Sequence, residues 1–109
     1  MTAIKQLEYF SAAQIKHTLV AERWRISTIM LDHPANVMGR AMDILLDPLL
    51  GRPDGKYETM VFDVASASPT MDLSCDRADT EEAAIANHDR RVRERAEQDD
   101  AAEKEKRGD

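Results

Sequence analysis

The chain has 109 residues, a net charge of −6 and a single cysteine, and 33% of its residues are charged. A chain of this length forms at most one domain, the acidic balance excludes non-specific binding to nucleic acid or to an anionic membrane, and a lone cysteine excludes an internal disulfide. No apolar run is long enough to span a membrane and the first ten residues lack a secretory pattern, so we expect a cytoplasmic protein.

The N-terminal third of the chain predicts a short helix followed by two strands. Three apolar side chains at near-helical spacing indicate a helix over residues 3–13. Residues that favour β-structure then dominate residues 15–20 and again residues 24–31. The link at residues 21–23 is short enough for a β-hairpin, although it lacks the Asn-Gly or Asp-Gly pair that is typical of such turns.

A helix is predicted between the second strand and the third. Asp32, His33 and Pro34 are typical of a helix start, because Asp is a common capping residue and proline suits the first helical turn. The predicted helix covers residues 35–47, and Pro48 should stop or kink it, since proline clashes with the preceding turn. Its apolar residues form a broad stripe: Val37, Met38, Ala41, Met42, Leu45 and Leu46.

The rest of the chain predicts a third strand, a short fourth strand and a second helix. Residues 56–64 alternate between two sets of side chains, and residues 71–75 suit a short strand. The more apolar set of the third strand contains Glu58, Met60, Phe62 and Val64. Asp79 or Thr80 caps the final helix. The inward-facing stripe of this helix contains Ala84, Ile85, His88 and Val92.

Together these elements predict an α+β fold. It consists of a small antiparallel sheet of three to four strands, a C-terminal helix packed on the sheet, and a helix inserted between strands. Residues 1–93 form a single domain. Residues 94–109 have alanine as their only apolar residue, which predicts a charged helix extension or a disordered tail.

Three short segments of the chain form an ordered pattern. Residues 26–30 read Ile-Ser-Thr-Ile-Met, residues 58–62 read Glu-Thr-Met-Val-Phe, and the final helix contains Thr80, Glu82, Ala84 and His88. This pattern resembles an uncharacterised family of small proteins encoded by phages, prophages and other mobile elements. The resemblance covers residues 24–92, and the helical insertion departs from the short glycine-rich link of similar proteins. It implies a mobile-element origin and a location in the bacterial host cytoplasm, and it implies no activity.

His88 is the candidate functional histidine, because histidine can act as a base or as a metal ligand. The alternative is a partly buried histidine that hydrogen-bonds the sheet and packs against it. The other potential ligands, His17, His33 and Cys75, do not have the close spacings of a metal site. Cys75 lacks a neighbouring positive charge and is expected to be a structural thiol with a raised pKa.

The sequence contains no nucleophile elbow, phosphate-binding glycine loop or dinucleotide fingerprint. We therefore expect no enzyme activity, no catalytic residue, no cofactor and no bound metal.

The inserted helix offers more apolar surface than so small a domain needs. Methionine-rich surfaces adapt well to partners, so these residues are candidates for a partner-binding or homodimer surface: Met38, Met42, Leu45, Leu46 and Leu49. The alternative is that this helix covers the second face of the sheet or completes the core.

These observations favour a non-catalytic accessory protein of phage or mobile-element origin that binds a protein partner, with no direct nucleic-acid or membrane binding. One alternative is an acidic inhibitor of a host defence or DNA-handling complex, which would occupy a site built for nucleic acid. Another is a small enzyme or metal-dependent protein centred on His88.

Overall fold

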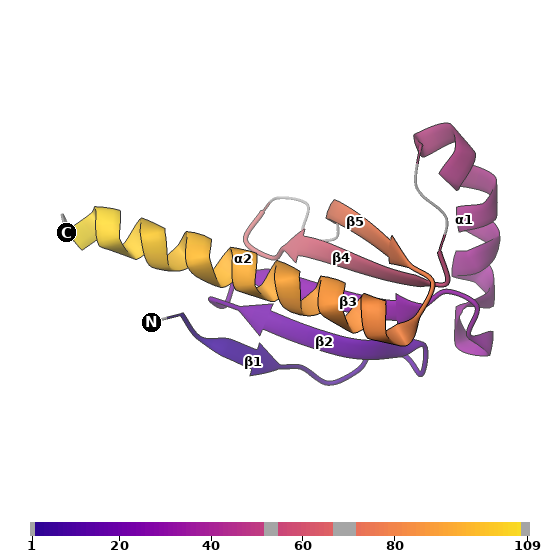
Figure 1. The fold of residues 1–109 in the computed structure, drawn as a ribbon, viewed down its shortest axis with the longest axis horizontal. Coiled ribbons are helices and arrows are strands. Elements are labelled where there is room, and N and C mark those ends of the chain that lie inside the picture. The colour runs from indigo at the N-terminus through magenta and orange to yellow at the C-terminus, as the bar shows by residue number, and fades with distance from the viewer. Residues whose placement is uncertain (1, 52–54, 67–71, 108–109) are drawn as a thin grey trace.

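The computed structural model describes residues 2–51, 55–66 and 72–107, with the side chains of residues 72–74 excepted. They form one five-stranded antiparallel sheet in the order β1-β2-β3-β4-β5, with a long C-terminal helix across one face (Figure 1). The α+β class and the C-terminal helix on the sheet are thus confirmed. The elements are β1 (Ile4–Gln6), β2 (Gln14–Val20), β3 (Trp24–Met30), the 3₁₀ helix η1 (Pro34–Asn36), α1 (Val37–Leu50), β4 (Tyr57–Asp63), β5 (Asp72–Ala78) and α2 (Glu81–Arg107).

The predicted helix over residues 3–13 is wrong, and the sheet has five strands for this reason. Residues Ile4–Gln6 form β1, which pairs antiparallel with β2, and the amide of Leu7 continues the ladder by donating to the His17 carbonyl. Three apolar residues are a weak helix signal, whereas pairing with β2 satisfies the backbone hydrogen bonds of the segment. The predicted short strand at residues 71–75 is β5, although Met71 lies outside the described residues.

The hairpin between β2 and β3 forms as predicted, but with unusual turn residues. Ala21 and Glu22 both have a positive φ, 57° and 56°. Two successive residues in the left-handed region are the signature of a type I′ turn, whose twist matches that of the paired strands. Neither residue is a glycine or asparagine, so the turn contains backbone strain.

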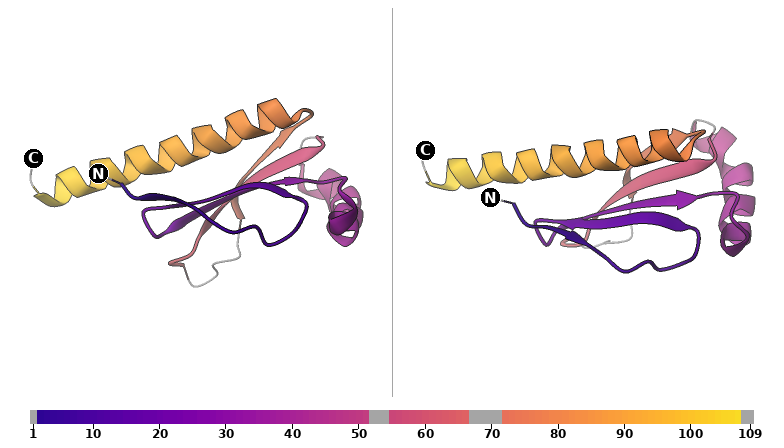
Figure 2. Two further views of the ribbon diagram at one scale, coloured as in Figure 1. Left: turned by 90° about the horizontal axis from the view of Figure 1, so that it is seen from below. Right: turned by 60° about the horizontal axis from the view of Figure 1, so that its bottom comes forward.

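The hydrophobic core lies between the sheet and α2. Val20, Ile26 and Val61 are fully buried, and partly buried side chains of Trp24, Val92 and other residues pack against them. Strand residues alternate between the two faces of the sheet, so the set of β4 residues that contains Val61 points toward this core. It is the less apolar of the two sets. The more apolar set faces away from α2, and α1 meets only one end of that face, where Asp47 binds Arg77 (Figure 2).

Helix α2 begins with a Thr80 cap, whose hydroxyl accepts a hydrogen bond from the amide of Ala83. Ala84 and His88 are buried against the sheet, as the inward stripe predicts. The helix continues to Arg107, so the charged end of the chain is helical and extends beyond the strands (Figures 1 and 2).

Helix α1 stands at the opposite end of the molecule from the end of α2 (Figure 1). The helical segment begins with η1, which is capped by His33 and not by Asp32: the His33 imidazole accepts from the amide of Ala35. Helix α1 itself begins at Val37, two residues after the predicted start. The helix does not stop at Pro48 but continues through Leu49 and Leu50. It ends at Gly51, whose φ of 67° is left-handed and suits glycine.

The strained β2–β3 turn gives a stability prediction. Replacing Ala21 and Glu22 together by Asn-Gly should raise the free energy of unfolding by about 1 kcal/mol, since both new residues tolerate positive φ. Urea denaturation measures the change. The control is Ala86→Gly on the exposed face of α2, which should lower stability by about 1 kcal/mol. A loss of stability in the turn variant would contradict the strain assignment.

Candidate functional site

Helix α1 turns its charged residues toward the body of the protein. Arg40 pairs with Asp32 in the preceding turn at 3.0 Å, and Asp47 accepts from the Arg77 guanidinium of β5 at 3.0 Å. Asp43 lies 4.0 Å from the same guanidinium. These three are the only charged residues of the helix, so its outward face carries no charge.

Arg77 is the anchor of this arrangement. Its side chain is fully buried, and its Nε donates to Oε2 of Glu58 at 2.7 Å while its terminal nitrogens reach Asp47. Burial by itself lowers the pKa of Arg77, but the hydrogen bonds that it donates to Asp47 and the charge of Glu58 raise this pKa overall. The guanidinium therefore stays charged and links α1 to β4 and β5.

The apolar residues of α1 face solvent. None of its residues is buried, so the alternative in which the helix completes the core does not hold. Met38 and Leu49 are 79% exposed, Leu45 is 66% exposed and Met42 is 52% exposed. Of the five residues predicted for partner binding, only Leu46 is partly buried. We call the exposed apolar residues of this helix the α1 face: Val37, Met38, Met42, Ile44, Leu45, Leu49 and Leu50.

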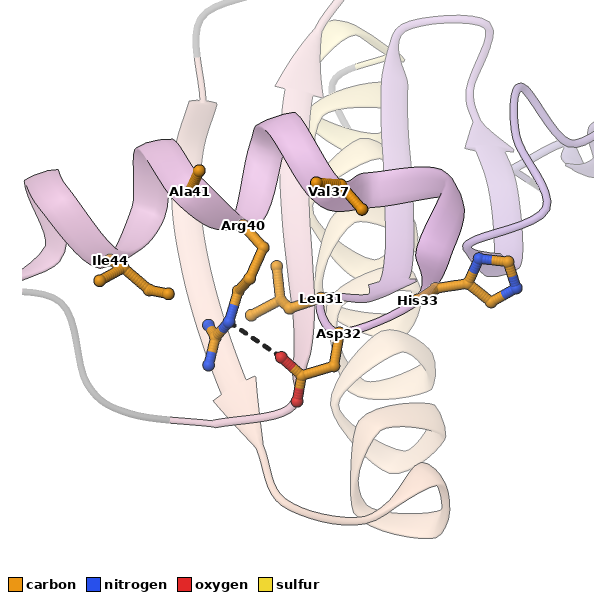
Figure 3. A pocket seen from close by; sticks show the side chains of 7 residues that line it. All are labelled: Leu31, Asp32, His33, Val37, Arg40, Ala41 and Ile44. Carbon is orange, nitrogen blue, oxygen red and sulfur yellow. Dashed lines mark ion pairs between the residues drawn. The ribbon is translucent and has the colours of Figure 1, made fainter.

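A pocket of about 260 Å³ adjoins the α1 face (Figure 3). The buried side chain of Leu31 and three residues of α1 supply its apolar lining, and the Asp32–Arg40 ion pair lies beside them. The pocket is lined by Leu31, Asp32, His33, Val37, Arg40, Ala41 and Ile44. It is small for a cofactor site but adds a hollow next to a surface of protruding side chains.

His88, the candidate histidine, lies at the centre of a polar network inside the core. Its Nε2 is 2.8 Å from the Thr18 hydroxyl and its Nδ1 is 2.8 Å from the Thr28 hydroxyl, which in turn lies 2.7 Å from the Thr59 hydroxyl. His88 is 0% exposed. Burial, followed by the charge of Lys16, lowers its pKa to about 4, so the ring is neutral near pH 7. Both ring nitrogens are therefore occupied, and no solute reaches them in this conformation.

The other potential ligands do not converge. His17 lies on the opposite sheet face from His88, where it packs against Phe10 with ring centroids 4.8 Å apart. Burial, and then Glu58, raises the pKa of Cys75 to about 12, as expected of a structural thiol. Within the described ranges, the carboxylates that gather closely enough for a metal are those of Asp99, Asp100 and Glu103 on α2. The Thr2 hydroxyl already lies within hydrogen-bond distance of both aspartates.

The sequence does not single out two parts of this site. Ile44 lies on the α1 face beside the pocket. It comes seven residues after Val37, which is two helical turns, so this spacing could have predicted that both residues lie on the same side of the helix. Arg77 has no local signal, because its partner Asp47 is thirty residues away.

Comparisons with known proteins give no relative: no protein-family model, curated protein or solved structure matches the chain. No helix in the described part of the chain is long and apolar enough to cross a membrane.

The Arg77 anchor predicts a large loss of stability on removal. Arg77→Met leaves the buried Glu58 carboxylate without its partner and should lower the free energy of unfolding by about 3–5 kcal/mol. The double variant Arg77→Met/Glu58→Met should recover part of this loss, because the mostly buried Asp47 carboxylate still lacks the guanidinium. Arg40→Met, which removes a surface ion pair, is the control and should cost less than about 1 kcal/mol. Urea denaturation measures these changes. If Arg77→Met and Arg40→Met lowered the free energy of unfolding equally, Arg77 would not be the anchor.

The buried His88 predicts a pH dependence of stability. Its pKa is about 4 in the folded protein, against 6.5 as the ordinary value, so the unfolded chain binds the proton more tightly. The neutral His88 ring makes its full contribution to the free energy of unfolding above about pH 6.5. As the pH falls toward 4, the free energy of unfolding decreases by roughly 3 kcal/mol because of this residue.

Denaturation of the wild type and of His88→Gln at a series of pH values measures this loss. The glutamine variant should show a shallower fall across the window, while Ala86→Gly, which changes no titratable group, should keep the wild-type slope. A wild-type slope in His88→Gln would show that the ring does not remain neutral in the core.

Proposed function

We propose that the protein is a non-catalytic accessory protein that binds a protein partner through the α1 face. One observation carries the proposal: every charge of α1 is paired toward the body, and its apolar residues are exposed. A helix that served only its own domain would show the opposite orientation, with its apolar stripe in the core.

The size of the α1 face supports binding. Its seven side chains expose an area on the order of 800 Å², whereas the largest apolar patch of a soluble monomer is usually about 300–600 Å². Three of the seven residues are leucines, and Met38 and Met42 add side chains that adapt to a partner's shape.

The alternatives have less support. An enzyme centred on His88 would need access to a ring that is fully buried and bonded at both nitrogens. An acidic inhibitor would need an array of exposed, unneutralised carboxylates. Among the described carboxylates, the exposed Asp89 pairs with Lys16, and the mostly buried Asp63 and Asp76 pair with Arg23 and Arg91.

The proposed setting is the cytoplasm of a bacterial host that carries a mobile element. Its support is the resemblance of residues 26–30, residues 58–62 and the start of α2 to the phage-encoded family.

A capture experiment tests the proposed function. Tagged wild type, Leu45→Asp and Val64→Asp are each incubated in lysate of the source cells, with an untagged copy of the chain added, and washed at low and then high salt. Binding by the α1 face predicts that captured protein survives high salt, since apolar contacts are weakly screened. It should be lost with Leu45→Asp and retained with Val64→Asp, whose exposed apolar residue lies outside α1.

Two results would count against this proposal. Capture that Leu45→Asp leaves unchanged would exclude the α1 face, and capture that high salt removes would favour the acidic inhibitor.

A further inference from the structure

We propose that the partner of the α1 face is a second copy of this chain, so that two copies pair through their α1 helices about a two-fold axis. This inference rests on the proposed function, because it identifies the occupant of the same surface.

The available area matches what a dimer needs. If all of this area were covered in both copies, about 1,600 Å² would be buried in total, the size of a standard stable interface; this is an upper bound, because the seven residues spread around roughly two thirds of the helix circumference.

The charge pattern of α1 suits self-pairing. A two-fold interface brings each surface against its own copy, so exposed charges near the axis would meet like charges. The three charged side chains of α1 are instead held by Asp32 and Arg77 of their own chain. An antiparallel helix pair also sets the positive end of each helix dipole beside the negative end of the other.

The shape of the surface points the same way. An interface between identical surfaces needs protrusions and hollows on one patch. Met38 and Leu45 protrude from α1, and the pocket between Val37, Ile44 and Leu31 lies on the same helix (Figure 3). The protruding side chains of one copy thus have an apolar recess available on the other.

The distribution of charge weakens the main objection, because half of the net charge belongs to residues 94–109, which contain seven acidic and four basic residues. Each copy has a net charge of −6, which opposes association. The charged end of α2 lies at the opposite end of the molecule from α1 (Figure 1), and the molecule is 48 Å long. Pairing through α1 keeps the two charged ends far beyond the screening length of about 8–10 Å.

Sedimentation equilibrium of the purified full-length protein, over about two decades of concentration, tests this inference. The expected result is a dimer whose dissociation constant changes little with salt. Leu45→Asp places a charge in the interface and should weaken the dimer by about 100-fold or more, whereas Val64→Asp should leave it unchanged. Because Leu45 contacts solvent, the variant should fold, and circular dichroism checks that its helix content is retained.

A cross-linking experiment gives an independent readout. Under mild oxidation, Leu45→Cys should form a disulfide-linked dimer, whereas Val64→Cys should not. The native Cys75 should not compete, because its pKa of about 12 keeps it in the unreactive thiol form.

A wild type that stays monomeric at every concentration would overturn the inference, and so would a dimer that Leu45→Asp leaves intact. The capture experiment then separates the two proposals. If a different protein is captured and its capture is lost with Leu45→Asp, the proposed function holds, but the partner is that protein and not a second copy of the chain. Capture that Leu45→Asp leaves unchanged would refute both proposals.

Discussion

The buried guanidinium of Arg77 is the contact on which the placement of α1 depends. It lies between Glu58 of the sheet and Asp47 of the helix, and its full burial means that these carboxylates must stay close to it. The polar side of α1 is therefore held against the body. The apolar side is thereby turned away from the sheet, and it faces solvent.

A second polar network stabilises the other side of the sheet in a different way. His88 joins three threonines of β2, β3 and β4 through hydroxyl contacts of 2.7–2.8 Å, with no solvent access. Such a network fixes the position of α2 on the strands, because a shift would leave buried polar groups without partners. The histidine thus has a structural explanation that uses both of its ring nitrogens.

These two networks divide the molecule into a scaffold and an exposed helix. The sheet and α2 contain the core, while α1 contributes no buried residue and presents most of the large exposed apolar side chains. A surface that is built this way is dispensable for the core and available for association. Sequence change on the α1 face should accordingly alter binding more readily than folding.

Local patterns in the sequence determined the α+β class, β2, β3, β4, the start and inward stripe of α2, and the apolar stripe of α1. Each of these depends on residue spacing or capping within a few positions. Only the tertiary structure decided that Ile4–Gln6 form a strand, that the less apolar set of β4 faces the core, and that the stripe of α1 faces outward. The periodicity of a helix shows which side is apolar, but not which side meets the rest of the chain. Here an ion pair between residues 47 and 77 makes that choice, and a contact over thirty residues leaves no local pattern in the sequence.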